Sequence, residues 1–400
     1  MIRQAVILVG GLGTRLGERT RTVPKPMLEI GSRPFLDTLI DELARYDVFD
    51  EILLLAGHKA ELVEAHYVGV MRGRARIAVS RETQPLGTAG ALIHARDLLH
   101  NRFLLLNGDS LFDFNLLDLI SLARTGGVHM ALRAGVEGDR YGRVVLEADV
   151  VREFLAPGIG ATGPVNAGIY VVDKSVVSDI GKLPASLEQD VFPKLAACGA
   201  LHGTAYRGYF IDIGIPEDLA RADRELHERL RRPAVFFDRD GVLNRDSGYA
   251  YEADKLEWIE GAREAVKAVN DAGYFAFVIT NQSGIARGYY EEHHVVALHR
   301  WMADQMALVG AHIDAFEYCP DHPEGTIAGY CRASDRRKPA PGMITDLVKR
   351  FPIDMTRSMV IGDKPSDMEA AQAAGVAGHL FAGGNLEAFV RERLSSASKA

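Results

Sequence analysis

Cysteine is scarce in this chain, which has three in 400 residues: Cys198, Cys319 and Cys331. Because the number is odd and the spacing fits no disulfide framework, we expect a reducing compartment, the cytoplasm. Long apolar runs are missing too. No stretch approaches the about 20 apolar residues that cross a bilayer, and the apolar start at residues 5–9 is too short for a signal segment. We therefore expect no membrane partner.

Basic residues are not in excess either. Lys and Arg number 46 against 54 Asp and Glu, which gives a formal charge of -8. A nucleic-acid-binding surface needs a basic stripe, and none stands out, so we expect no nucleic-acid partner. Local Lys and Arg can still bind anionic sugar phosphates. A length of 400 residues suits two domains of about 200 residues each.

The first half alternates short apolar runs with helical periods, which is the βαβ rhythm of a parallel sheet. We expect strands at residues 5–9, 51–55, 77–79 and 103–106, and helices at 35–45, 59–67, 88–99 and 116–124. In such a sheet, ligands bind at the carboxyl ends of the strands. From residue 129 to 173 the pattern changes to closely spaced strands, which suit a subdomain that faces a sugar.

A charged helical segment at residues 216–231 ends before Pro233, and a new strand begins at once at residues 234–237. Proline stops the helix and the βαβ rhythm starts again, so we place the boundary here. We expect further strands at residues 275–279, 315–318, 359–361 and 379–381, with helices between them. The sequence thus predicts two domains, 1–232 and 233–400.

A glycine-rich turn follows the first predicted strand. Its residues include Gly10, Gly11, Gly13, Thr14 and Arg15, and Lys25 stands between two prolines shortly after. Glycines let backbone N–H groups approach phosphate oxygens, and the two cations can add contacts to a polyphosphate. A turn of this kind, taken alone, is as often a plain tight turn.

Three further segments favour a nucleotide site. Gly87 and Thr88 open a helix and can cradle a base, while Asp109 and Asp212 each follow an apolar run where a carboxylate can hold Mg²⁺. Either aspartate alone could be a turn or cap residue. Together with the glycine turn they predict a metal–triphosphate site.

These segments, in this order, resemble the sugar-1-phosphate nucleotidyltransferases, closest to the guanylyltransferase branch, over residues 1–230. The resemblance implies that a sugar 1-phosphate attacks the α-phosphorus of a nucleoside triphosphate (NTP) and expels pyrophosphate. It also implies that Arg15 and Lys25 hold the phosphates, that Asp109 and Asp212 carry Mg²⁺, and that Asn166 and Gly168 contact the sugar. One departure is large: the Glu-Lys pair of the family should fall near Ala156-Pro157 and is missing.

The second half carries Asp238-x-Asp240 directly after a hydrophobic strand, where Asp238 can be a nucleophile and Asp240 an acid/base. An acidic turn would explain this pair if it stood alone. Other segments at strand ends or helix starts supply the remaining groups. Thr280, Asn281 and Gln282 offer donors that can bind phosphate, and Lys338 can neutralise the phosphoryl oxygens. Asp363 would complete a Mg²⁺ site with Asp238 and Asp240.

This set resembles the haloacid dehalogenase-like phosphatases over about residues 233–395. The segments 241–244, 280–288 and 337–343 are similar to the D-glycero-D-manno-heptose 1,7-bisphosphate 7-phosphatases, with the histidinol-phosphatase group as a neighbour. The resemblance implies that Arg337 contacts the substrate.

Many such relatives carry a zinc loop of Cys-x-His and Cys-x-Cys before the Arg-Lys-Pro segment. Here Cys319 occupies the first place, but Asp321 replaces the His, and Ser334 and Arg336 stand where the last two Cys belong. A mixed set of Cys319, His322 and Cys331 is conceivable, but without the usual spacing we expect no zinc.

The resemblances predict an α/β protein with a Rossmann-like nucleotidyltransferase sheet followed by a haloacid dehalogenase-like Rossmannoid sheet. The two halves would act on sugar phosphates and an NTP with Mg²⁺: the phosphatase removes the 7-phosphate of heptose 1,7-bisphosphate, and the transferase activates the 1-phosphate, with GMP favoured. One alternative is a mannose- or other hexose-1-phosphate transferase fused to a phosphatase of different specificity. Another is a sugar-nucleotide-binding regulatory module whose transferase half has decayed.

Overall fold

The computed structural model describes residues 1–11, 13–135, 143–155 and 163–397, which form two compact units, Met1–His227 and Glu228–Ala400. The division falls within helix α7 (Pro216–Arg229), whereas the sequence analysis places the domain boundary at Pro233. The limits of the independently folding domains therefore stay a prediction. Every helix in the described ranges is too short or too polar to span a bilayer.

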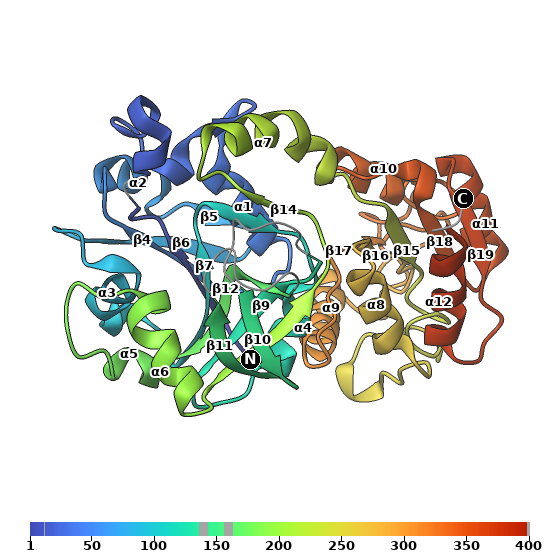
Figure 1. Cartoon of the computed structure of the whole chain (residues 1–400). Coiled ribbons are helices and arrows are strands. Elements are labelled where there is room, and N and C mark those ends of the chain that lie inside the picture. The colour runs from blue at the N-terminus through green and yellow to red at the C-terminus, as the bar shows by residue number, and fades with distance from the viewer. Residues whose placement is uncertain (12, 136–142, 156–162, 398–400) are drawn as a thin grey trace. The chain divides into compact units, whose positions relative to one another are not determined.

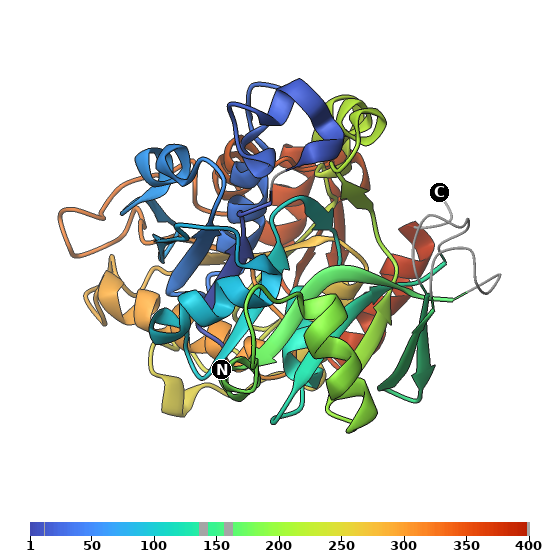
Figure 2. The same ribbon diagram turned by 60° about the vertical axis from the view of Figure 1, so that its left-hand side comes forward.

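The first unit is built on a ten-stranded sheet, whose strands lie side by side in Figure 1 and, after a 60° turn, in Figure 2. In spatial order its strands are β10 (Arg143–Glu147), β11 (Val150–Leu155), β13 (Leu201–Tyr206), β9 (Val128–Arg133), β12 (Val165–Asp173), β7 (Arg102–Asn107), β1 (Gln4–Leu8), β4 (Glu51–Ala56), β6 (Ala75–Arg81) and β5 (Met71–Arg72). Two short pairs lie outside this sheet: β2 (Glu29–Ile30) with β3 (Arg33–Pro34), and β8 (Ser110–Phe112) with β14 (Phe210–Asp212).

The middle of this sheet is parallel, as the βαβ rhythm predicts. β1 pairs in parallel with β4 on one side and with β7 on the other, and β4 pairs with β6. Because both faces of a parallel sheet are buried, the sequences of these strands are continuous apolar runs. Their carboxyl ends stay in register: Val9 N donates to Leu55 O at 2.8 Å, and Gly108 N donates to Leu8 O at 3.0 Å. The segments that follow β1, β4, β6 and β7 therefore start along one edge.

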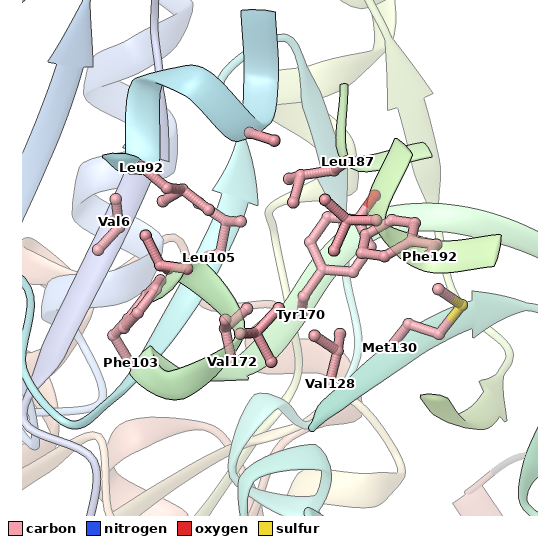
Figure 3. Close-up of a cluster of buried hydrophobic side chains, with 14 of the residues drawn as sticks. Val6, Leu92, Phe103, Leu105, Val128, Met130, Tyr170, Val172, Leu187 and Phe192 are labelled. Atoms are coloured by element: carbon pink, nitrogen blue, oxygen red, sulfur yellow. The ribbon is translucent and has the colours of Figure 1, made fainter. Parts of the chain in front are cut away.

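The other half of the sheet is mostly antiparallel. β12 pairs antiparallel with both β7 and β9, and β10 with β11, which confirms the closely spaced strands expected between residues 129 and 173. Figure 3 shows one face of the core, where Tyr170 of β12 lies against Phe192, with ring centroids 5.0 Å apart. Burial of these large rings fixes β12 against the helices that cover it.

The helices of this unit are η1 (Thr14–Thr20), η2 (Lys25–Met27), α1 (Phe35–Ala44), α2 (Ala60–Tyr67), α3 (Gly87–His94), η3 (Arg96–Leu98), α4 (Leu116–Leu122), α5 (Lys174–Ser178), the π-helix η4 (Leu187–Val191), α6 (Phe192–Ala197) and α7. The single helix expected at residues 88–99 is divided, because Ala95 leaves helical geometry at φ -87°, ψ 6°.

The second unit contains a five-stranded, fully parallel sheet. Its order is β17 (Ala315–Cys319), β16 (Phe275–Asn281), β15 (Ala234–Phe237), β18 (Met359–Gly362) and β19 (Ala377–Leu380). The helices are η5 (Ala253–Lys255), α8 (Ala262–Asp271), α9 (Glu292–Ala307), α10 (Gly342–Arg350), η6 (Met355–Arg357), α11 (Pro365–Ala374) and α12 (Leu386–Ala397). The central strand β15 is wholly buried, and it ends directly before Asp238. The α/β class predicted for both halves is confirmed.

Two candidate active sites

The glycine turn after β1 adopts a conformation that needs glycine at position 13. Gly13 has φ +60°, and a Cβ there would lie 2.8 Å from Cγ2 of Thr20. A Cβ on Gly10 would come within 3.4 Å of Gly57 N, at the end of β4. The turn therefore packs closely against the neighbouring strand end. Arg15 is exposed on η1, and Leu12 lies outside the described residues.

Lys25 lies between the two aspartates that the sequence analysis singled out. Its Nζ is 2.5 Å from Oδ2 of Asp109 and 3.6 Å from Oδ1 of Asp212. The antiparallel pairing of β8 with β14 sets Asp212 opposite Ser110, which brings the two distant segments together. The aspartate side chains are 33% and 26% exposed, so their oxygens remain accessible to a cation. Carboxylates in such a setting fit Mg²⁺.

Glu82 is a residue that the sequence analysis missed. It follows β6 at the same edge, and its backbone N donates to Ala56 O at 2.8 Å. The side chain is 9% exposed, its Oε2 accepts from Leu86 N at 3.3 Å, and burial raises its pKa. A buried carboxylate directly before the predicted base cradle is a signal for ligand binding, and its place after a strand could have revealed it.

The predicted base cradle is tightly built around Gly87 and Thr88. Gly87 has φ +80°, and a Cβ there would lie 2.4 Å from Ala185 O, so only glycine fits. The hydroxyl of Thr88 accepts from Leu187 N at 2.9 Å. These two residues thus fasten the start of α3 to Ala185 and to the first residue of η4, and their contact with a nucleotide stays a prediction.

The predicted sugar-contacting strand contains a bulge. Asn166 Nδ2 donates to the Tyr170 hydroxyl at 2.8 Å, its Oδ1 accepts from Gly168 N at 3.0 Å, and the register of β12 against β9 shifts here. Gly168 has φ +77°, and a Cβ would lie 2.6 Å from Asn107 Nδ2. Glycine therefore lets β12 approach the end of β7. Ala156 and Pro157, where the Glu-Lys pair is missing, lie outside the described residues.

Glu188, on η4, is a second residue that the sequence analysis missed. Its side chain is exposed at the surface, yet partial desolvation of the carboxylate raises its pKa, and the negative charge of Asp109 raises it further. The pKa of buried Tyr170 is raised first by burial and then by the negative charges of Glu188 and Asp109. Glu188 thus shares its electrostatic surroundings with the proposed metal-binding carboxylate, and no spacing rule connects the two in the sequence.

In the second unit, Lys338 lies between two buried carboxylates. Its Nζ is 2.9 Å from Oδ1 of Asp238 and 2.6 Å from Oδ1 of Asp367, and it donates to Ile279 O at 2.9 Å. Burial raises the pKa of Asp238 to about 6, although the ammonium group of Lys338 opposes this. The ammonium group favours the ionised form of this buried carboxylate, which is the form that can act as a nucleophile.

Asp240 is held by several donors. Asn244 Nδ2 donates to its Oδ1 at 2.9 Å, and Gln282 Nε2 donates to its Oδ2 at 3.0 Å. Gln282 is itself fixed, because it donates to Thr280 Oγ1 at 2.9 Å and accepts from the Tyr290 hydroxyl at 2.7 Å. The predicted residues at the end of β16 therefore reach the site, with Gln282 supporting the predicted acid/base.

A cation would fit beside Asp363. Carboxylate oxygens of Asp238, Asp363 and Asp367 all lie within 4.8 Å of one another. Within the described part of the chain, Oδ1 of Asp363 is buried without a hydrogen-bond partner, and Gly241, at φ +94°, leaves room for this carboxylate. Such an oxygen set suits Mg²⁺. The group contains Asp367 in place of Asp240, so a metal-binding role for Asp240 stays a prediction.

A pocket of about 460 Å³ is lined by residues of this site, among them Asp238, Asp240, Lys338 and Asp367. Arg337 and Lys364 add positive charge to its wall, and Lys364 Nζ lies 3.0 Å from Oδ2 of Asp246. Asn281 pairs reciprocally with the backbone of Lys338 through two bonds of 3.0 Å, which fixes the lysine segment against β16. The pocket has room and charge for a sugar that carries a second phosphate.

The segment where relatives carry zinc is held by ion pairs and hydrogen bonds. Arg332 Nε lies 3.0 Å from Oδ1 of Asp321, and Arg336 lies 2.5 Å from Glu317 and 3.0 Å from Asp346. The close group of metal-ligating side chains found in the described residues does not include the thiols of this segment. The expected absence of zinc stays a prediction.

Comparison with known families matches one family to each half of the chain. Residues 4–229 match the nucleotidyl transferase family, and residues 335–397 match the HAD-hydrolase-like family. The D-glycero-beta-D-manno-heptose-1,7-bisphosphate 7-phosphatase of Rhodopseudomonas palustris is 51% identical over 170 residues, which are 42% of this chain and 94% of that protein. The corresponding alpha phosphatase of Burkholderia mallei is 44% identical over 37% of this chain and 78% of that protein.

A solved structure resembles the first unit. HddC from Yersinia pseudotuberculosis, in complex with GMP-PN, has 29% sequence identity and a TM-score of 0.51. The similarity covers 56% of this chain and 100% of that one.

Proposed function

The chain belongs to the nucleotidyl transferase family and, over 170 residues, to the heptose-1,7-bisphosphate 7-phosphatase family, and from this premise we propose a bifunctional enzyme. The second unit removes the 7-phosphate of D-glycero-D-manno-heptose 1,7-bisphosphate. The first unit then transfers a nucleotidyl group, GMP in our proposal, to the resulting heptose 1-phosphate and releases pyrophosphate. The observation that carries the proposal is the placing of Lys338 between Asp238 and Asp367 in a pocket with further cations.

The phosphatase step uses Asp238 as nucleophile. A carboxylate oxygen of Asp238 bonds to phosphorus as the bond between phosphorus and the C7 oxygen breaks, and Asp240 gives a proton to that oxygen. Water then attacks the aspartyl phosphate, Asp240 takes a proton from the water, and phosphate leaves. Lys338 offsets negative charge beside the nucleophile. Asp238 and Asp363 would hold Mg²⁺, which supplies further charge neutralisation on the phosphoryl oxygens.

Nucleotidyl transfer needs no covalent intermediate on the protein. An oxygen of heptose 1-phosphate bonds to the α-phosphorus of the NTP as the bond to the bridging oxygen breaks, and pyrophosphate leaves. In our proposal Gly10, Gly11 and Gly13 approach the phosphates, and Lys25 and Arg15 neutralise them. Asp109 and Asp212 would hold Mg²⁺, which supplies charge neutralisation on the triphosphate.

Two observations support guanine as the base. HddC, the structural neighbour, was solved with GMP-PN. In this chain, Glu82 places a buried carboxylate directly before the predicted base cradle. Guanine presents two adjacent N–H donors on its Watson–Crick edge, whereas a carboxylate offers acceptors alone, so the two are complementary.

Product analysis tests the whole proposal. The intact chain would receive the α or β anomer of heptose 1,7-bisphosphate, Mg²⁺ and each NTP in turn, and products would be identified by mass spectrometry. We expect phosphate, pyrophosphate and GDP-heptose with GTP. Nucleotide transfer to the bisphosphate before loss of the 7-phosphate would contradict the order of steps. Activity with mannose 1-phosphate at a higher kcat/KM would favour the alternative of a hexose-1-phosphate transferase.

A further inference from the structure

Arg239 is a fully buried charged side chain, with 0% exposure, between the two aspartates of the phosphatase site. Its Nη2 donates to both carboxylate oxygens of Asp240 at 3.0 Å, and its Nε donates to Oδ1 at 3.2 Å. A guanidinium group that meets a carboxylate through several bonds fixes the direction of that carboxylate as well as its place. Arg239 therefore constrains the residue that we assign as acid/base.

Two acceptors behind Arg239 hold the guanidinium group itself. Nη2 also donates to Ala250 O at 2.7 Å, and Nη1 lies 3.4 Å from Nε2 of His299 on α9. The ring of His299 stacks on Phe316, with centroids 4.6 Å apart and planes at 19°. This stacking sets the direction in which Nε2 points.

His299 is suited to accept this bond. Its side chain is buried, and burial lowers its pKa well below the ordinary value, with the positive charge of Arg239 lowering it further. A neutral imidazole carries one proton, so Nε2 can accept from Arg239 when the proton is on Nδ1. Loss of this acceptor would leave Nη1 of the buried guanidinium group without the partner that His299 supplies, and the group would then be held from the Nε and Nη2 side alone.

We propose that Arg239 and His299 are positioning residues for Asp240: His299 fixes Arg239, and Arg239 aims the Asp240 carboxylate at the leaving oxygen. Neither residue touches the phosphate in this arrangement. The inference rests on the proposed phosphatase function, because it assigns a task to residues behind that site.

Two substrates with different leaving groups can distinguish a positioning role for Arg239 and His299 from a general role in the stability of the fold. A sugar alkoxide is a poor leaving group and needs the proton of Asp240 as the P–O bond breaks, whereas p-nitrophenolate leaves without a proton. Misplacing Asp240 should therefore slow phosphoenzyme formation from a sugar phosphate far more than from p-nitrophenyl phosphate. Damage to the fold, or to Asp238 and Lys338, would slow both reactions alike. The parameter to compare is kcat/KM, which reports steps up to the phosphoenzyme.

Two variants of the full-length chain give a matched test. His299→Phe keeps a ring for stacking and removes the acceptor, while His299→Gln loses the ring and keeps an acceptor. For His299→Phe we expect kcat/KM to fall by roughly 10- to 100-fold with heptose 1,7-bisphosphate, part of what general acid catalysis contributes, and by at most about threefold with p-nitrophenyl phosphate. His299→Gln should recover most of the loss with the bisphosphate.

Equal losses with the two substrates, no loss in His299→Phe, or a Gln variant as slow as the Phe variant would each overturn the inference. Failure of the proposed function itself looks different, because the native chain would then fail to hydrolyse heptose 1,7-bisphosphate, whatever its activity toward p-nitrophenyl phosphate. Thermal unfolding of both variants shows whether a loss shared by the two substrates comes from the fold.

Discussion

The ammonium group of Lys25 lies 2.5 Å from Oδ2 of Asp109, although the two residues are 84 positions apart in the sequence. Asp212 lies on the other side of the same lysine. Lys338 repeats the arrangement in the second unit, between Asp238 and Asp367. In each site one lysine offsets two carboxylates, so the carboxylates can stay close together without a bound cation.

Replacement of Asp109 by asparagine should strongly slow nucleotide transfer and leave phosphate release unchanged. A neutral amide cannot offset a cation as a carboxylate does, so we expect transfer to fall on the order of 100-fold. With heptose 1,7-bisphosphate, GTP and Mg²⁺, heptose 1-phosphate should accumulate. The exposed Asp97 provides a control, since Asp97→Asn makes the same chemical change away from the site. Unchanged GDP-heptose formation in Asp109→Asn would refute the assignment.

Replacement of Glu82 by glutamine should weaken the preference for GTP. The amide keeps the size of the side chain but loses its charge and one acceptor, so we expect kcat/KM for GTP to fall by roughly 10- to 100-fold. The value for ATP should change little. Competition between GTP and ATP at equal concentrations measures the ratio directly, with the exposed Glu217→Gln as control. A parallel fall for both nucleotides would mean that Glu82 supports the fold and does not read the base.

Asp238→Asn should abolish bisphosphate hydrolysis and leave transfer to added heptose 1-phosphate intact. The substitution keeps the shape and removes the nucleophile, so we expect a loss of several orders of magnitude. Phosphate release measures the first activity and pyrophosphate release the second. The exposed Asp254→Asn is the matched control. Near-native hydrolysis by Asp238→Asn would show that another group attacks phosphorus.

Acid should destabilise the first unit through His129. Burial, with help from the charge of His202, lowers the pKa of His129 to about 4 from 6.5. Above pH 6.5 the ring is neutral in both states. Between pH 6.5 and 4, His129 is protonated in the unfolded chain but stays neutral in the folded chain. The free energy of unfolding therefore falls as the pH falls through this window.

The size of this effect can be measured by urea unfolding at pH 7.5 and pH 5. His129→Gln removes the titration but keeps a polar group near the Thr204 hydroxyl, which lies 2.8 Å from Nε2. We expect the loss of unfolding free energy between the two pH values to be about 2 kcal/mol smaller in this variant than in the native chain. The exposed His100→Gln should keep the native pH dependence, and an identical dependence in all three proteins would rule out His129 as the cause.

The sequence predicts the architecture well where apolar runs are continuous. β15 forms at the residues expected for it, because a strand buried on both faces leaves an unbroken hydrophobic signal. The same logic places Asp238 and Asp109 after strands. The division of α3 from η3 was not predicted, because it depends on the backbone at a single alanine, Ala95.

Residues whose importance comes from tertiary contacts escaped prediction. Glu188 reaches the surroundings of Asp109 through the packing of η4, and Asp367 reaches Lys338 through the first turn of α11. His299 sits in the middle of a helix and has no motif around it. Periodicity and spacing describe local order along the chain, whereas these positions depend on which elements meet in space.

Lys25 and Lys338, which each lie between two aspartates, allow the opening of the two units to be followed by chemical labelling. Lys25 is 9% exposed and Lys338 is 4% exposed, and each amine is paired with carboxylates. An amine-acylating reagent should therefore reach them slowly while their unit is folded and quickly once it opens. Because the two lysines fall in different peptides, mass spectrometry can follow the opening of each unit separately within one sample.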